Sequence, residues 1–143
     1  MDRVLAAVDG SEASNRSLDT LVAMVKEFTS APDVVVLTVK VPMPPLTGMG
    51  VVVSADMLDT YYAQAQEETI ASARAKLDAA GLKYLERKEV GDPAEMIVQV
   101  AKETGAKLIF IGSRGMGALG TLMLGSTSNK VIHQTSIPVV ITH

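Results

Sequence analysis

The sequence predicts an α/β fold in which helices cover both faces of an open, mainly parallel sheet. The main observation is that five short apolar segments alternate along the chain with four segments of helical periodicity. Crossovers between parallel strands are expected to be right-handed. In addition, the 143 residues, of which 48% are hydrophobic, are enough for one core, and no linker divides them. We therefore expect a single domain over residues 1–143.

The first half of the chain is expected to contain two strands, one helix and a loop. Residues 4–8 form a continuous apolar run, typical of a buried strand, that ends at the turn-forming and capping residues Asp9, Gly10 and Ser11. A helix then begins at Ser11 and ends before residues 29–32. The valine-rich residues 33–41 predict a strand covered on both faces. Residues 42–54, with three prolines and two glycines, predict a mobile loop.

The second half supplies the remaining strands and helices. A long helix is expected from residue 55 to residue 80, where Gly81 ends it. Apolar and polar residues alternate over residues 82–90, which predicts an outer strand. Asp92 and Pro93 then cap and open a helix that runs to Gly105. Residues 107–111 predict a buried strand, residues 126–134 a fourth helix and residues 137–142 a last strand.

Composition excludes several classes of function. The chain has no cysteine, which excludes disulfides, thiolate metal sites and cysteine nucleophiles. Its net charge of −3 argues against a nucleic-acid partner. The N-terminus lacks the features of a signal peptide and no segment reaches transmembrane length, so we expect a cytoplasmic protein with no membrane partner.

Charge is distributed unevenly along the chain, and the distribution favours an anion site near the C-terminus. Residues 1–103 contain all 16 acidic residues, whereas residues 104–143 contain three basic residues and no acidic one. A nearby carboxylate would repel a phosphate, so a segment without carboxylates suits an anionic ligand.

Two glycine-containing segments follow predicted strands or open a predicted helix. In open parallel sheets, ligands bind beyond the carboxyl ends of the strands, and we expect the order 3-2-1-4-5, which makes the first and fourth strands neighbours. Glycine allows a phosphate to approach backbone N–H groups, and a helix N-terminus attracts anions. The two halves of the expected phosphate site are Gly112, Ser113, Arg114 and Gly115 after the fourth strand, and Gly125, Ser126, Thr127 and Ser128 at the start of the fourth helix.

Two common phosphate motifs are not supported. Gly115 and Gly120 have the spacing of a P-loop, but Thr121 stands where that motif needs lysine. Residues 115–120 do read G-x-G-x-x-G, but no Asp or Glu follows to bind a ribose, as a dinucleotide site requires.

The segment Gly112-x-x-Gly115, nine residues, Gly125-Ser126 resembles the G-2x-G-9x-G-[S/T] motif of the universal stress protein family. The opening strand with Asp9 and the closing strand at Pro138 are also similar to that family, so the resemblance covers the whole chain. It implies a three-layer, adenine nucleotide α-hydrolase-like fold with a five-stranded sheet. It also implies ATP binding, and a homodimer formed through the last strand at Val139, Val140 and Ile141.

Carried over by position, the resemblance implies specific contacts with ATP. Asp9 would contact the ribose or a phosphate-bound Mg²⁺, Gly10 and Ser11 would line the pocket, and Val39 would contact adenine. Ribose and phosphates would be bound by Gly112, Ser113, Arg114, Gly115, Gly125, Ser126, Thr127 and Ser128. The sequence departs from the family at Thr38, where many relatives have histidine, and in residues 42–53, which have no counterpart that we can assign.

Three functions remain open at this point. The first is a regulatory protein that binds ATP and hydrolyses it slowly or not at all. The second is a weak ATPase in which Asp9 positions Mg²⁺ and Ser113 or Ser126 orients water. The third is a dimeric interaction module without nucleotide. His133 and His143, the two histidines, belong to no nucleophile or metal-ligand pattern, which favours the first function over the second.

Overall fold

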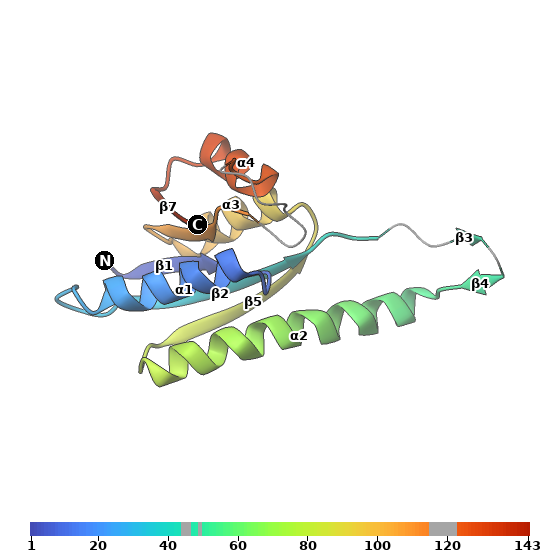
Figure 1. The fold of residues 1–143 in the computed structure, drawn as a ribbon, viewed down its shortest axis with the longest axis horizontal. Coiled ribbons are helices and arrows are strands. Elements are labelled where there is room, and N and C mark those ends of the chain that lie inside the picture. Colours follow the sequence, from blue (N-terminus) through green and yellow to red (C-terminus); the bar gives the residue numbers. More distant parts are fainter. Residues whose placement is uncertain (44–46, 49, 115–122) are drawn as a thin grey trace.

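The computed structural model describes residues 1–43, 47–48, 50–114 and 123–143. Its centre is a parallel sheet of five strands in the spatial order β5-β2-β1-β6-β7 (Figure 1). These correspond in chain order to the five strands that the sequence predicts, so the order 3-2-1-4-5 is confirmed. The strands are β1 (Arg3–Ala7), β2 (Asp33–Lys40), β5 (Tyr84–Val90), β6 (Ile109–Gly112) and β7 (Val139–Thr142).

Four helices form the outer layers, and the alternation of side chains along each strand divides the core between them. Val34 and Val36 of β2 pack on the side of α1 (Glu12–Val25) and α2 (Ala55–Ala79). Val35 and Leu37 point the other way, toward α3 (Pro93–Thr104) and α4 (Ser126–Gln134). Helices therefore cover both faces of β2, as its run of valines predicts. The three-layer α/β architecture is confirmed.

The helices begin where the sequence supplies caps. Ser11 and Ser54 accept backbone N–H groups at the starts of α1 and α2, and the carboxylate of Asp92 accepts the N–H of Glu95 at 3.0 Å in α3. Gly105 ends α3 in the left-handed region, at φ 68°, which glycine adopts without strain.

The region expected to be only a loop contains a short hairpin. Its strands are β3 (Thr47–Gly48) and β4 (Val51–Val52), which pair antiparallel. Strands of two residues are too short to show alternation in the sequence, so the prediction that residues 42–54 form a loop without strands was wrong at β3 and β4. α1 also ends earlier than expected, because 3.0 Å and 3.2 Å backbone bonds from Glu27 to Met24 and from Phe28 to Val25 form turns after its last residue.

None of the helices in the described ranges has both the length and the apolar character that crossing a bilayer requires.

Candidate functional site

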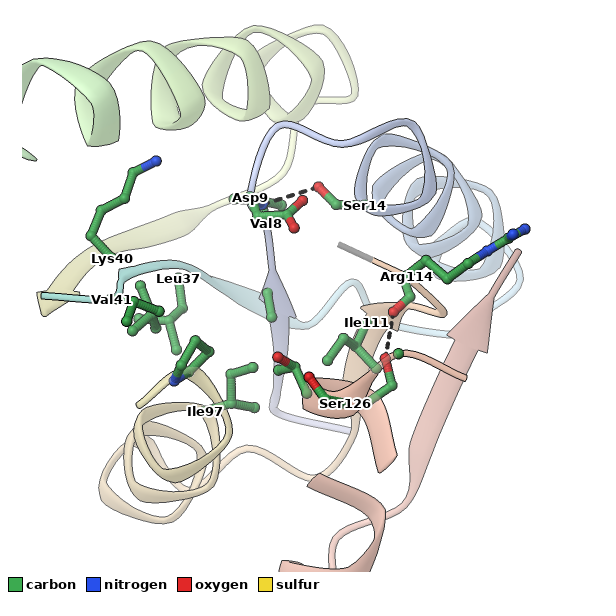
Figure 2. A pocket seen from close by; sticks show the side chains of 17 residues that line it. Val8, Asp9, Ser14, Leu37, Lys40, Val41, Ile97, Ile111, Arg114 and Ser126 are labelled. Carbon is green, nitrogen blue, oxygen red and sulfur yellow. Dashed lines mark hydrogen bonds between the residues drawn. The ribbon is translucent and has the colours of Figure 1, made fainter. Parts of the chain in front are cut away.

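A pocket of about 520 Å³ lies at the carboxyl ends of β1, β2 and β6, beside the N-termini of α3 and α4 (Figure 2). One side is apolar and the other carries hydroxyls and charges. The apolar lining is Ala7, Val8, Leu37, Val39, Val41, Pro93, Ile97 and Ile111. The remaining lining residues are Asp9, Ser14, Lys40, Gly112, Arg114, Gly125, Ser126, Thr127 and Ser128.

The two halves of the glycine motif meet at this pocket. The amide of Gly125 donates a 2.6 Å hydrogen bond to the carbonyl of Ser113, although the two residues are far apart in the sequence. Topology brings this about, because β6 ends beside β1 in the middle of the sheet and α4 starts over that end. An anion could therefore contact residues from both segments at once.

The N-terminus of α4 lacks a side-chain cap. Gly125 is its N-cap residue, at φ −64° and ψ 161°, and it has no side chain to accept a hydrogen bond. Hydrogen bonds among the described residues leave the amides of Ser126, Thr127 and Ser128 without an acceptor. These N–H groups, and the positive end of the helix dipole, suit a phosphate.

Gly112 and Ser128 have packing roles in addition to their place in the pocket wall. A Cβ on Gly112 would lie 2.7 Å from the backbone carbon of Ala13 and from the amide nitrogen of Ser14, so β6 approaches α1 as only glycine allows. The hydroxyl of Ser128, which is buried, donates a 2.8 Å bond to the carbonyl of Gly112. That bond ties α4 to the end of β6.

The turn after β1 is held by its own side chains. One carboxylate oxygen of Asp9 accepts the N–H of Ser11 at 2.9 Å, and the amide of Asp9 donates to the hydroxyl of Ser14 at 3.2 Å. The hydroxyl of Ser11 accepts the N–H of Ser14 at 3.2 Å, which caps α1. This leaves the second carboxylate oxygen of Asp9 for a ligand.

The charges around the pocket are few. Asp9 is the one carboxylate among the described lining residues. The lining cations are Lys40 and Arg114, and Figure 2 shows the Arg114 side chain extending away from Asp9 and Ser126. The donors that face the pocket are therefore mainly backbone amides and hydroxyls.

An ion pair links α3 and α4 beside the pocket. The Nζ of Lys130 lies 3.4 Å from an Asp92 oxygen. The hydrogen bond from the Glu95 amide, together with the charge of Lys130, lowers the pKa of Asp92 below its usual value. Asp92 therefore stays charged while it caps α3, whose first residue, Pro93, lines the pocket.

The structure distributes the residues expected from the sequence into three groups. Those that line the pocket are Asp9, Val39, Gly112, Arg114, Gly125, Ser126, Thr127 and Ser128. Gly10, Ser11 and Ser113 do not line it: Ser11 caps α1, and the Ser113 hydroxyl is buried with no hydrogen-bond partner. Gly115 lies outside the described residues.

Apart from Val39, sequence reasoning missed the apolar wall. Pro93 and Ile97 come from the start of α3, which follows the edge strand β5 and was not assigned to the site. The available signal was their position, because the N-terminus of a helix after a parallel strand lies at the same edge of the sheet as the strand ends.

The described residues contain no group of three or more His, Cys, Asp or Glu side chains that could bind a metal ion. Any Mg²⁺ here would need most of its ligands from a phosphate and from water, with one carboxylate oxygen from Asp9. That is a common way for proteins to bind Mg²⁺.

Comparison with known proteins identifies the family. The model of the Universal stress protein family matches residues 1–143. The chain belongs to the universal stress protein family. Universal stress protein YxiE of Bacillus subtilis is 32% identical over 145 residues, which cover 98% of this chain and 97% of that protein. The family resemblance seen in the glycine motif is thereby confirmed.

Solved structures of universal stress proteins have the same fold. One, solved in complex with cAMP, has a TM-score of 0.71 and 26% identity, and the match covers 99% of this chain and 97% of that one. UspA from Lactobacillus plantarum has a TM-score of 0.75 at 17% identity, covering 99% and 97% of the two chains, and this likeness shows the fold alone.

Proposed function

We propose that this universal stress protein is a single nucleotide-binding domain whose pocket binds ATP, and that it acts as a stress-response regulatory or protective protein. The observation that carries the proposal is that the uncapped N-terminus of α4 and the apolar wall belong to the same pocket. A phosphate would accept hydrogen bonds from the helix amides, and a purine would pack against the apolar wall. The relative solved with cAMP supports an adenine nucleotide as the ligand class.

In the proposed arrangement, the two sides of the pocket recognise different parts of the nucleotide. Adenine would lie among apolar side chains that include Val39 and Ile97. The amides and hydroxyls of Ser126 and Thr127 would donate to phosphate oxygens. The second carboxylate oxygen of Asp9 would contact the ribose or a phosphate-bound Mg²⁺.

Regulation fits this pocket better than hydrolysis does. The described lining residues contain no histidine, and both oxygens of their one carboxylate, Asp9, have a role in the proposed complex: one accepts the Ser11 amide and the other contacts the ribose or Mg²⁺. A general base needs an unengaged acceptor within reach of the attacking water. We therefore expect that ATP is released largely intact, and that its binding changes stability or contacts with other proteins. Release of labelled ADP well above the buffer rate in single-turnover assays, abolished in Asp9→Ala, would contradict this.

Thermal unfolding with and without nucleotide tests the binding proposal. ATP at about 100 times its Kd should stabilise the fold by about 2.7 kcal/mol through mass action. Gly125→Val should abolish this effect, because its side chain occupies the space where phosphate meets the helix amides. Asn129→Val, on an exposed position of α4 that does not line the pocket, is the matched control and should respond to ATP as the wild type does. No stabilisation of the wild type at millimolar ATP would favour a module without nucleotide.

We also propose a homodimer that forms through β7. The sheet has two edge strands, and they differ in charge: β5 carries Glu86, Arg87, Lys88 and Glu89, whereas β7 reads Val-Val-Ile-Thr. Charged edge strands resist pairing with a second copy and uncharged apolar ones favour it. An isologous antiparallel contact at Val139, Val140 and Ile141 would close the dimer.

Sedimentation velocity tests the dimer. The carbonyls of Pro138 and Thr142 accept N–H groups from Ile109 of β6 and from Ser113, which follows β6, so the N–H of Ile141 faces the open edge. Ile141→Pro removes that edge donor without removing a β6–β7 bond, and should give a monomer. Leu85→Ser on the opposite edge is the control and should remain dimeric. If Ile141→Pro remained dimeric and Leu85→Ser became monomeric, the interface would be assigned to β5 instead of β7.

A further inference from the structure

The part of β2 that lines the pocket has a neighbouring strand on one side only. The pairing of β1 with β2 ends at Leu37. We call residues 39–41, which line the pocket past this point, the β2 wall. On the other side of the wall lies β5, and the amide of Gly91 after β5 donates a 2.9 Å hydrogen bond to the carbonyl of Lys40. The wall therefore depends on β5, and on what holds β5 and the chain after β2, for its position.

Two buried polar side chains of α2 contact the backbone on both sides of the β2 wall. The first turns of α2 contain no buried residue, and its buried face begins at Tyr62 and continues at Gln66, one helical turn on. The Tyr62 hydroxyl accepts the N–H of Met43, just after the wall. The side-chain amide of Gln66 donates a 2.6 Å hydrogen bond to the carbonyl of Glu89, the β5 residue that lies opposite Val39. α2 therefore holds the chain after the wall and the strand beside it.

The remainder of the buried face of α2 is apolar. It consists of Ile70, Ala73 and Leu77, which pack in the core against β1 and β2. Burying an amide or a phenol has a cost that hydrogen bonds must offset, whereas an apolar side chain would bury without that cost. Polar residues thus occupy this face only where α2 passes the pocket. Their hydrogen bonds go to the main chain, so they fix its position there.

We propose that Tyr62 and Gln66 are positioning residues for the base end of the nucleotide pocket. The inference rests on the proposed function, in which adenine lies against Val39 and Ile97. Neither Tyr62 nor Gln66 lines the pocket, so both act through the wall and not by contact with the nucleotide. Their bonds hold the wall in one arrangement before the ligand arrives. Apparent affinity falls in proportion to the fraction of molecules in the binding-competent arrangement.

The phosphate end of the pocket is held by other bonds. The amide of Gly125 donates to the carbonyl of Ser113, and the hydroxyl of Ser128 donates to the carbonyl of Gly112. Neither of these bonds involves α2. Loss of the two α2 contacts should therefore weaken recognition of the base and leave recognition of phosphate unchanged. A general loss of stability would not separate the two ends of the ligand in this way.

Affinities for ATP and for inorganic tripolyphosphate, which has no base, test the proposal. Tyr62→Phe with Gln66→Met keeps buried side chains of similar size and removes both contacts, and it should bind ATP about tenfold more weakly in calorimetry. Tripolyphosphate should bind the wild type and this double variant equally. In hydrogen exchange, the amides of Met43 and Gly91 should exchange faster in the variant, and that of Gly125 should not change. An equal loss of affinity for ATP and for tripolyphosphate would overturn the proposal.

Arg74→Met is the matched control. Arg74 also connects α2 to β5, through 2.7 Å and 3.1 Å hydrogen bonds to the carboxylate of Glu86, but Glu86 lies opposite Val36, away from the β2 wall. Its loss should lower stability to urea and leave the affinity for ATP unchanged. If Arg74→Met weakened ATP binding as much as the double variant does, any contact between α2 and β5 would have this effect. That result would overturn the positioning roles.

Failure of the proposed function gives a different result from failure of this inference. A wild type that does not bind ATP would overturn both. A wild type that binds ATP with the same affinity as the double variant would leave the ATP site in place and overturn the positioning roles alone. Circular dichroism checks that each variant is folded. If the double variant does not fold, Tyr62→Phe, which removes a single oxygen atom, should still bind ATP about threefold more weakly than the wild type.

Discussion

The amide of Gly125 donates its hydrogen to the carbonyl oxygen of Ser113 across 2.6 Å. This bond joins the start of α4 to the residue that follows β6, and it directs the helix N-terminus at the pocket. This backbone hydrogen bond requires the chain at Ser113 and the chain at Gly125 to lie close together, which small residues permit. The glycine motif of the family therefore fixes the position of the N-terminus of α4, and it also leaves space for a ligand.

Gly112→Ala should destabilise the fold by about 1–3 kcal/mol, the usual cost of overpacking. Its added Cβ would lie 2.7 Å from backbone atoms of Ala13 and Ser14, and backbone cannot move aside as a flexible side chain can. Urea unfolding monitored by circular dichroism measures the change. Gly125→Ala is the control: its φ of −64° suits any residue, so it should cost less. Equal stability of Gly112→Ala and wild type would contradict the close packing of β6 on α1.

Ser128→Ala should also destabilise the protein, by about 1–3 kcal/mol, because it removes a buried 2.8 Å hydrogen bond to the Gly112 carbonyl. Thr127→Ala, at the neighbouring position that makes no such bond among the described residues, should change stability less. Thermal unfolding without ligand compares the two. A larger loss in Thr127→Ala would mean that the Ser128 bond does not anchor α4.

Asp9→Asn separates the charge of Asp9 from its role in the turn. The asparagine side-chain oxygen can still accept the Ser11 amide, so unfolding without ligand should be unchanged. MgATP affinity measured by calorimetry should fall about tenfold or more, since a contact with a charged group contributes about 1.5–3 kcal/mol. With Mg²⁺ chelated, the difference between variant and wild type should shrink. Equal affinities with Mg²⁺ present would remove Asp9 from the proposed metal contact.

Asp92 should make stability depend on pH in a defined direction. Its pKa is lowered in the fold from an ordinary 3.8, chiefly by the Glu95 amide, so folding favours the charged carboxylate. This contribution is complete above the unfolded pKa and is lost as pH falls through the lower folded pKa. At neutral pH, Asp92→Ala should cost about 1 kcal/mol as a lost N-cap.

Asp92→Asn is the matched control for that prediction, because it keeps a capping oxygen and removes only the charge. The stability difference between wild type and Asp92→Asn should therefore be present at neutral pH and shrink as pH falls below 3.8. Urea unfolding over this range measures it. A difference that grows on acidification would contradict the lowered pKa.

Local signals in the sequence fixed several elements because the relevant physics is local. The limits of α3 were predicted correctly from Asp92 and Pro93 at its start and Gly105 at its end. A capping carboxylate, the fixed φ of proline and a left-handed glycine each act within a few residues. The predicted limits of α4, residues 126–134, also agree with the structure. The hairpin of β3 and β4 was missed because two-residue strands carry no period.

The candidate site was predicted less completely than the fold. The hydroxyl of Ser113 was expected to face a phosphate, yet it is buried and the whole residue is only 1% exposed. Backbone hydrogen bonds to Thr142 and from Gly125 hold the residue in this position. Conversely, Ile97 lines the pocket although no motif marks it, because its place depends on how α3 packs on the sheet.

The sequence by itself determined that this chain is a three-layer α/β protein of the universal stress protein family, because periodicity, caps and motif spacing are properties of neighbouring residues. Only the tertiary structure decided which motif residues face the pocket, what forms its apolar wall, and that the first turns of α2 leave the core. These depend on contacts between segments far apart in the chain, and a linear pattern does not contain the distances at which such segments meet.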